Sequence, residues 1–160
     1  MAQRRINTQE YKLKKYFRTM RDIKTIFIHC TATKQTATPE SIAESFKNRG
    51  WKFPGYHYLI TPEGKTLQLL DISLPSNGVK GHNTESINIA YIGGITNDGR
   101  PTDNRTIEQK AAIVHLLIQL REKFPHSHIM GHRDIWSTRD SRKWKKNCPC
   151  FNATEEYRYI

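Results

Sequence analysis

Three residues that lie far apart in the chain, His29, His132 and Cys148, are of the types that hold zinc in enzymes. A catalytic zinc ion usually takes three protein ligands and keeps a fourth position open for water or substrate. Each histidine follows an apolar run and the cysteine precedes a proline, so this set could support a metal hydrolase. Structural roles are equally open to them, because single histidines are often only hydrogen-bonded and single cysteines are often core residues. Their spacing alone does not join them into a site.

The segments around these residues predict a sheet of short strands, because they are rich in β-branched and aromatic residues. The predicted strands are residues 24–30, 56–60, 65–70, 87–92 and 128–130. The first strand ends next to His29, and the last comes just before His132. The second and third flank a turn that contains proline and glycine, and they are expected to pair as a hairpin.

Two amphipathic helices are predicted between the strands. The first starts at Thr38-Pro39-Glu40, an N-cap followed by a proline and an acidic residue, and ends at Gly50. Its apolar stripe is Ile42, Ala43 and Phe46.

The second helix begins at a capping box of Thr106 and Gln109 and runs for about five turns to Pro125. Its apolar face is predicted to be Ile107, Ala111, Val114, Leu117, Ile118 and Phe124. Because strands and helices alternate, the predicted fold class is α/β, a single domain with a central mixed β-sheet flanked by helices.

The length of 160 residues suits one domain, which we expect at residues 23–160 behind a basic N-terminal extension at residues 1–22. Apolar residues within the extension have a rough helical spacing. The sequence has no apolar run of about 20 residues that would span a membrane and no signal-peptide pattern. We therefore expect a chain made in the cytoplasm. Three cysteines are too few for a disulfide framework, so metal binding or burial is the better reading.

The formal net charge of +11 predicts attraction to a polyanion, such as nucleic acid, a membrane surface or an anionic cell-wall polymer. The basic runs lie near the N-terminus and between residues 133 and 146. A solvated surface is the favoured interpretation of these runs, ahead of a dedicated binding patch.

Several separate blocks in a fixed order resemble the zinc-dependent N-acetylmuramoyl-L-alanine amidases that are related to peptidoglycan recognition proteins. The resemblance runs from about residue 24 to residue 157. The blocks are residues 26–33 (IFIHCTAT), 50–51 (GW), 55–58 (GYHY), 81–83 (GHN), 86–87 (SI), 91–94 (YIGG), 131–134 (GHRD) and 146–151 (KNCPCF).

The resemblance implies a ligand set for zinc. The first histidine of the family pattern falls at His29, and the second falls at His132 in the GHRD block. The third ligand is a cysteine before proline in the phage-lysozyme-like branch, which assigns Cys148. Cys150 is a competitor two residues on, at a position where the family has a small residue that is not a ligand.

The implied reaction is hydrolysis of the amide between N-acetylmuramic acid and L-alanine in peptidoglycan. Zinc would polarise the carbonyl and lower the pKa of water. Lys146 matches a lysine that could stabilise negative charge, although Lys145 is adjacent, and Tyr56 matches an active-site tyrosine. Other branches use a glutamate in the central strand, and residues 87–92 contain no carboxylate.

The resemblance also implies contacts with the glycan strand and the stem peptide, the partners of such an enzyme. His57, His82 and Asn83 are the predicted substrate-binding residues, although His57 could simply orient the site or pack. The long loop between His132 and Cys148 carries cations and two tryptophans, Trp136 and Trp144. It could shape the substrate groove or be a surface loop.

Two alternatives come from other classes of function. A domain that binds peptidoglycan without cutting it would not need the full ligand set. A basic nucleic-acid-binding protein would fit the charge, but no known nucleic-acid motif is present. An amidase without a signal peptide would act on the cell wall after release or export by another route. The sequence carries no signal for an oligomeric state.

Overall fold

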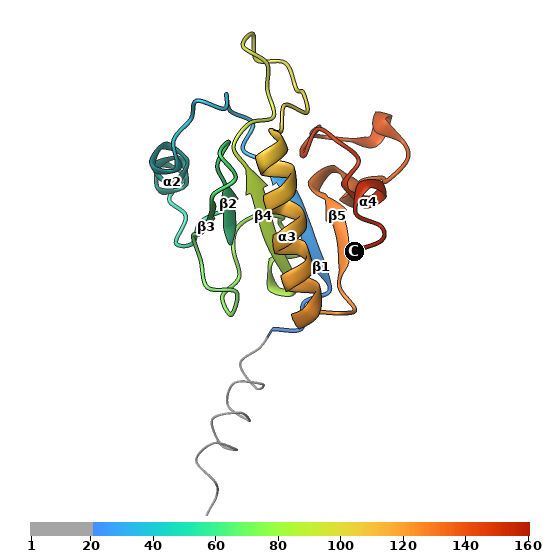
Figure 1. The fold of residues 1–160 in the computed structure, drawn as a ribbon. Helices are drawn as coiled ribbons and strands as arrows, with labels where there is room; N and C mark the ends of the chain where they lie inside the picture. Colours follow the sequence, from blue (N-terminus) through green and yellow to red (C-terminus); the bar gives the residue numbers. More distant parts are fainter. Residues whose placement is uncertain (1–20) are drawn as a thin grey trace, which may run out of the picture.

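The computed structural model describes residues 21–160 and places five short strands in one mixed sheet (Figure 1). They are β1 (Thr25–Cys30), β2 (Tyr58–Ile60), β3 (Thr66–Gln68), β4 (Ser86–Tyr91) and β5 (His128–Gly131). Their order is β3-β2-β4-β1-β5. The β2–β3 pair is an antiparallel hairpin, and the other three pairs are parallel. All five predicted strands are confirmed, with shorter bounds in the hairpin.

The predicted helical segment of the N-terminal extension lies outside the described residues. Arg21, which we assigned to the extension, binds the body of the domain instead. Its guanidinium donates to the carbonyls of Ile72, Asn83 and Ser86 at 2.8–3.1 Å.

The two faces of β1 have different surroundings, because alternate residues of a strand point to opposite sides of the sheet. Ile26 and Ile28 belong to the main apolar core, beneath a long helix. Phe27 and His29 therefore point to the other face. Phe27 is in register with Asn88 of β4, so Asn88 lies on the same face as His29.

The helix α2 (Pro39–Asn48) covers part of that second face. As predicted, Thr38 is its N-cap, and its hydroxyl accepts a hydrogen bond from the third helical residue. Ile42 and Phe46 are buried and pack with Leu59 of β2. The apolar stripe thus packs α2 against the β2 side of this face. The part of the face around β1 stays free for other groups.

The helix α3 (Ile107–Lys123) lies across the first face of the sheet and has the predicted capping box (Figure 1). Its predicted apolar face is wrong in part, because Ile107 is 82% exposed and Ile118 is 48% exposed. Ala111 and Val114 are exposed too. The buried face consists of Gln109, Ile113, Leu116, Leu117 and Leu120.

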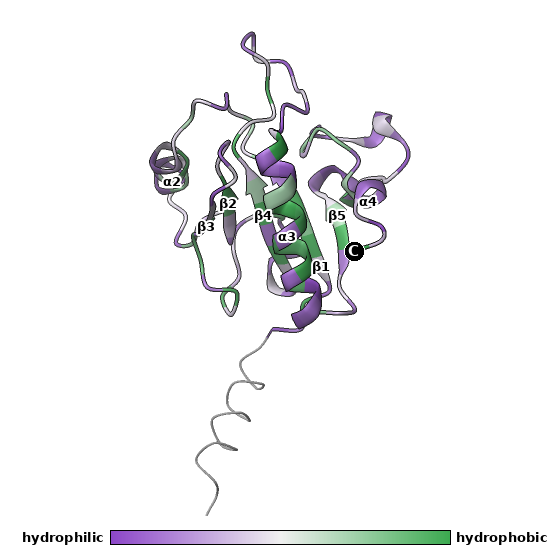
Figure 2. Cartoon of the chain, viewed as in Figure 1, coloured by the Kyte–Doolittle hydropathy of each residue, from purple (hydrophilic) through white to green (hydrophobic). Residues whose placement is uncertain are grey.

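Gln109 helps to account for the difference between the predicted and the observed buried face of α3. Its buried amide donates to the carbonyls of Ile92 at 2.9 Å and Ile60 at 3.3 Å, at the ends of two strands. These bonds turn the side of the helix that carries Gln109 toward the sheet. Hydrophobic residues occur on more than one side of α3 (Figure 2), so periodicity alone did not identify the buried side.

A buried arginine fixes the C-terminal segment against the start of α3. Arg105 pairs with Asp103 at 2.8 Å and with Glu156 of α4 (Ala153–Glu156) at 2.9 Å. Its guanidinium also lies 3.2 Å from the ring centre of Phe151. The segment that carries Cys148 is therefore anchored on its C-terminal side.

No helix within residues 21–160 combines the length and the apolar character that crossing a membrane requires.

Candidate metal centre

The two predicted ligand histidines sit where neighbouring parallel strands end. His29 is the fifth residue of β1, and His132 opens the short helix η2 (His132–Ile135) directly after β5. Since β1 and β5 are parallel neighbours, their carboxyl ends meet at one edge of the sheet.

Cys148 reaches the same edge through two hydrogen bonds to the backbone. Its carbonyl accepts from the N–H of Arg133 at 2.8 Å. Its sulfur lies 3.2 Å from the N–H of Cys30, which donates to it. This bond holds the sulfur beside the end of β1, where His29 lies.

The three side chains converge, with one donor atom of each within 4.8 Å of the others. The sulfur of Cys148 lies 3.8 Å from Nδ1 of His29, and the two imidazole centres are 4.8 Å apart. Within residues 21–160, this is the one group of three or more His, Cys, Asp or Glu donors close enough to share an ion.

His29 is held by an amide. Its Nε2 lies 2.8 Å from Oδ1 of Asn88, and both side chains are buried. Because an amide oxygen only accepts hydrogen bonds, this contact places the proton of a neutral imidazole on Nε2. The lone pair on Nδ1 then faces the thiol of Cys148.

Within residues 21–160, the ring of His132 is held by stacking and not by a side-chain hydrogen bond. Its ring lies on that of Trp136, with centres 5.6 Å apart and planes 20° from parallel. Trp136 comes from the long basic loop, so this part of the loop supports a site residue. Trp144 lies further away, where its ring faces the guanidinium of Arg133 at 3.8 Å and its N–H donates to Ser137.

Both imidazoles are neutral at neutral pH, as metal ligands must be. Burial lowers the pKa of His29 to about 4 and that of His132 to about 3. The ammonium of Lys146 lowers both pKa values further, which shows that its charge acts on this site.

Cys150, the competing cysteine, points away from the two histidines. Its sulfur lies 3.8 Å from the sulfur of Cys30 and 3.3 Å from the carbonyl oxygen of Gly94. Hydrogen bonding to Cys30 and burial raise the pKa of the Cys150 thiol. It packs behind the donor group of His29, His132 and Cys148.

A cavity of about 490 Å³ opens onto the three donors. One wall comes from α2, including Ser41, Ser45 and Phe46, and the opposite wall comes from His132, Lys146 and Cys148. The cavity therefore lies between α2 and the loop that joins the two ligand segments, on the sheet face that α2 leaves partly open.

Tyr56 and Lys146, the two predicted catalytic residues, both line this cavity. The ring of Tyr56 lies 5.2 Å from that of His29, and its hydroxyl is 3.5 Å from the carbonyl oxygen of Cys30. Burial raises the pKa of Tyr56, so its hydroxyl keeps its proton. Both lysines are exposed, but only Lys146 lines the cavity, so the geometry favours Lys146 in the choice between the two.

The three predicted substrate-binding residues lie outside the lining of the cavity. His57 is fully buried, with Nδ1 accepting from the N–H of Asn88 and Nε2 beside the carbonyl of Leu74. Asn83 uses its side-chain oxygen to accept from the N–H of Val79. His82 is exposed, with its ring edge against Phe27.

Sequence reasoning missed two residues near the site, Asn88 and Arg49. Asn88 was read only as an apolar strand position without a carboxylate. Arg49 follows α2, lines the cavity and places its guanidinium 5.2 Å from the ring centre of Trp51. An amide inside an otherwise apolar strand and a cation at the end of a helix were the available signals.

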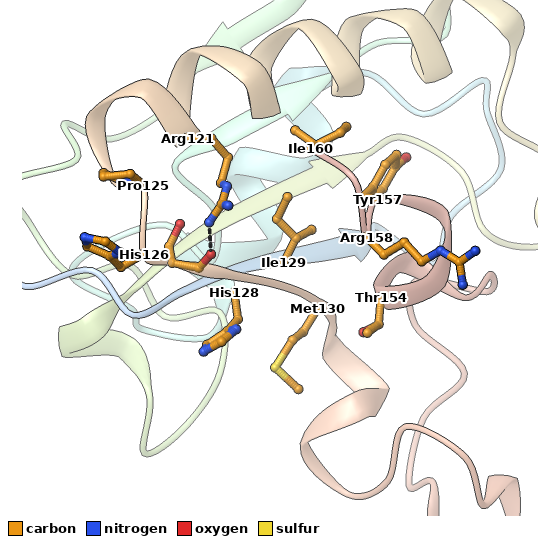
Figure 3. A pocket seen from close by; sticks show the side chains of 11 residues that line it. Arg121, Pro125, His126, His128, Ile129, Met130, Thr154, Tyr157, Arg158 and Ile160 are labelled. Atoms are coloured by element: carbon orange, nitrogen blue, oxygen red, sulfur yellow. Dashed lines mark hydrogen bonds between the residues drawn. The ribbon is translucent and has the colours of Figure 1, made fainter.

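A second cavity of about 530 Å³ lies beside β5, between the end of α3 and α4 (Figure 3). Its polar side chains are largely used within the fold. Arg121 donates to the carbonyl of Ser127, and the hydroxyl of Thr154 lies 2.8 Å from a carboxylate oxygen of Asp134. It is slightly larger than the first cavity, but it lacks a convergent donor group.

Residues 19–150 match the family described as N-acetylmuramoyl-L-alanine amidase. The chain is 33% identical to the endolysin of Klebsiella phage KP32 over 129 residues, which cover 79% of this chain and 80% of that protein. It is also 33% identical to the endolysin of Enterobacteria phage K11 over 128 residues, with the same coverage.

Among solved structures, the endolysin N-acetylmuramoyl-L-alanine amidase LysCS from Clostridium intestinale URNW has a similar fold. The TM-score is 0.69 at 23% identity, over 86% of this chain and 82% of that chain. The chain therefore belongs to the N-acetylmuramoyl-L-alanine amidase family, and it is an enzyme that hydrolyses an amide bond of peptidoglycan.

Proposed function

We propose that this amidase depends on zinc, held by His29, His132 and Cys148. The observation that carries the proposal is the convergence of these three side chains within 4.8 Å at the bottom of an open cavity. Two imidazoles and one thiol form a donor set that suits zinc, and catalytic zinc sites use three such ligands. Both histidines are neutral, and the sulfur receives a backbone N–H, so the residues fit the ion.

When bound, zinc supplies a Lewis acid that polarises a carbonyl and makes water more acidic. The chain's own residues act around it. Lys146 lines the cavity, and we assign its ammonium the role of stabilising negative charge that gathers on the carbonyl oxygen during attack. The Tyr56 hydroxyl keeps its proton, so Oη donates a hydrogen bond to a reacting oxygen and orients it.

The walls of the cavity hold the substrate. We propose that a strand of substrate lies in the cavity between α2 and the basic loop, with the scissile amide next to the three donors. The substrate we propose is peptidoglycan, cut between N-acetylmuramic acid and L-alanine. Relatives named endolysins support a lytic role, in which the enzyme acts on the cell wall after release or export by another route.

The test is digestion of purified peptidoglycan with zinc-loaded and with chelated protein, followed by mass spectrometry of the soluble products. We expect free stem peptides that begin at L-alanine, only with metal and not with His29→Ala. If the amides between N-acetylmuramic acid and L-alanine stay intact with zinc-loaded protein, the proposal is wrong.

The two neighbouring cysteines give a matched pair for the ligand assignment. Cys148→Ser removes a donor, so we expect loss of stoichiometric zinc and of activity. Cys150→Ser changes a sulfur that packs behind the site, so zinc content is expected to stay at one ion per chain. Zinc is measured by atomic emission after dialysis, and loss of zinc only in the Cys150 variant would reverse the assignment.

A further inference from the structure

Asn88 links the sheet to the candidate zinc ligand His29. Its side chain is completely buried on the sheet face that carries His29, and its Oδ1 lies 2.8 Å from Nε2 of the imidazole. No charged group takes part in this contact.

We propose that Asn88 is a positioning residue that holds His29 in the tautomer protonated on Nε2, so that Nδ1 is free to bind the metal. This proposal rests on the proposed zinc site. A neutral imidazole carries one proton, and a partner that only accepts at Nε2 assigns that proton to Nε2. Metal-binding histidines usually have such a partner on the other nitrogen, commonly a carboxylate or a backbone carbonyl. Here an amide takes that place.

In the structure, the nitrogen of the Asn88 amide faces two serine hydroxyls. Its Nδ2 lies 2.9 Å from Oγ of Ser76 and 3.4 Å from Oγ of Ser86. With the amide nitrogen directed to these hydroxyls, the amide oxygen is directed to His29. A flipped amide would offer an N–H to Nε2 and would leave the proton of His29 on Nδ1, where it blocks the metal.

The space around the amide is closely fitted. A Cβ atom added at Gly78 would lie 2.3 Å from both Cγ and Oδ1 of Asn88, so the glycine allows the loop to close over the side chain. The backbone of Asn88 is fixed too, because its N–H donates to Nδ1 of His57 at 3.0 Å and its carbonyl accepts from the N–H of His57 at 2.8 Å. Buried His57 thus contacts the backbone of Asn88, which links it indirectly to His29.

The neutral partner has a consequence for charge. An amide fixes the tautomer without adding a negative charge next to the site, whereas a carboxylate would fix it and also make the imidazole more basic. Asn88→Asp should therefore keep the Nε2 tautomer, while Asn88→Leu, which is similar in size but has no polar group, should release it.

The experiment begins with metal-free protein labelled with ¹⁵N in histidine, because the tautomer can be read by long-range ¹H–¹⁵N NMR without zinc. We expect the Nε2-protonated form of His29 in the wild type and in Asn88→Asp, and a mixture of tautomers in Asn88→Leu. Zinc affinity, measured by competition with a chromophoric chelator, should fall by about 10–100-fold in Asn88→Leu.

Gln109→Leu is the matched control, because it also removes a buried amide but on the opposite face of the sheet, under α3. It should leave the His29 tautomer and zinc affinity unchanged even if stability falls. A His29 proton on Nδ1 in the wild type would overturn the proposal and needs no variant to fold. Unchanged tautomer and affinity in Asn88→Leu would overturn it as well. Failure of the wild type to bind zinc would instead refute the proposed zinc site, while the tautomer would still report on Asn88.

Discussion

Lys146 and Lys145 are adjacent, yet the structure gives them different surroundings. Both are exposed, but only Lys146 lines the cavity and lowers the pKa of both site histidines. We expect Lys146→Met to lower kcat on peptidoglycan at least roughly tenfold, because a fixed positive charge near the reacting oxygen is lost.

Lys145→Met is the control for that substitution. It removes the same charge from the next position, so it corrects for any general attraction between a basic protein and an anionic wall. We expect its kcat to stay within about twofold of the wild type. Turbidity loss of purified cell walls at saturating substrate measures both variants, and an equal loss of rate in the two would contradict the role of Lys146.

The residue types of the site were readable in the sequence, but their convergence was not. His29 and Cys148 are 119 positions apart, and the distance between them depends on strand pairing. The resemblance to a family was what grouped the three residues into one predicted site, and in the structure they lie close together. The amide of Asn88 is visible in an apolar strand, but its role could not be predicted from the strand alone. That role depends on His29, on the loop at Gly78 and on serines from two segments.

At the scale of elements, strand and helix positions could be predicted because propensity and capping act locally. The buried face of α3 could not be predicted in the same way, because α3 has apolar residues on more than one side and the polar Gln109 belongs to the buried one. Ile113 is fully buried on the side of α3 that faces the sheet, while Ile107, six residues earlier in the same helix, is 82% exposed. The sheet carbonyls that bind Gln109 select between these apolar sides.

The two isoleucines give a direct test of this face. Ile113→Ala should lower the free energy of unfolding by about 2–5 kcal/mol, because it leaves a cavity in the core. Ile107→Ala should change it by about 0.5 kcal/mol or less, because the side chain is already in water. Urea unfolding followed by circular dichroism measures both, and a larger loss for Ile107→Ala would contradict the structure.

At the scale of the whole molecule, three buried histidines make folding depend on pH. Burial lowers the pKa of His29 and His57 to about 4 and that of His132 to about 3. An unfolded chain has histidines with pKa values near 6.5, so it binds more protons than the folded chain below that pH. The contribution of these neutral histidines to the free energy of unfolding is fully present above pH 6.5 and is lost as the pH falls toward 4.

We therefore expect the metal-free protein to be less stable at pH 5 than at pH 7.5. Each buried histidine should contribute roughly 1–2 kcal/mol to the difference. Urea midpoints at the two pH values measure it at constant ionic strength. The same midpoint at both, or a higher one at pH 5, would contradict the neutral state of these side chains in the folded chain.

The pairing of β1 with two later strands also has a kinetic consequence. β1 pairs with β4 and with β5, so the sheet closes only after two long stretches of chain have been brought back to its first strand. Such distant parallel pairings are slow to form, since loop entropy is lost before contacts compensate for it. His29 lies on the first strand of the sheet, whereas His132 and Cys148 follow the last strand. A chain that stops short of pairing β5 would lack the complete site, so metal occupancy would mark molecules that have finished folding.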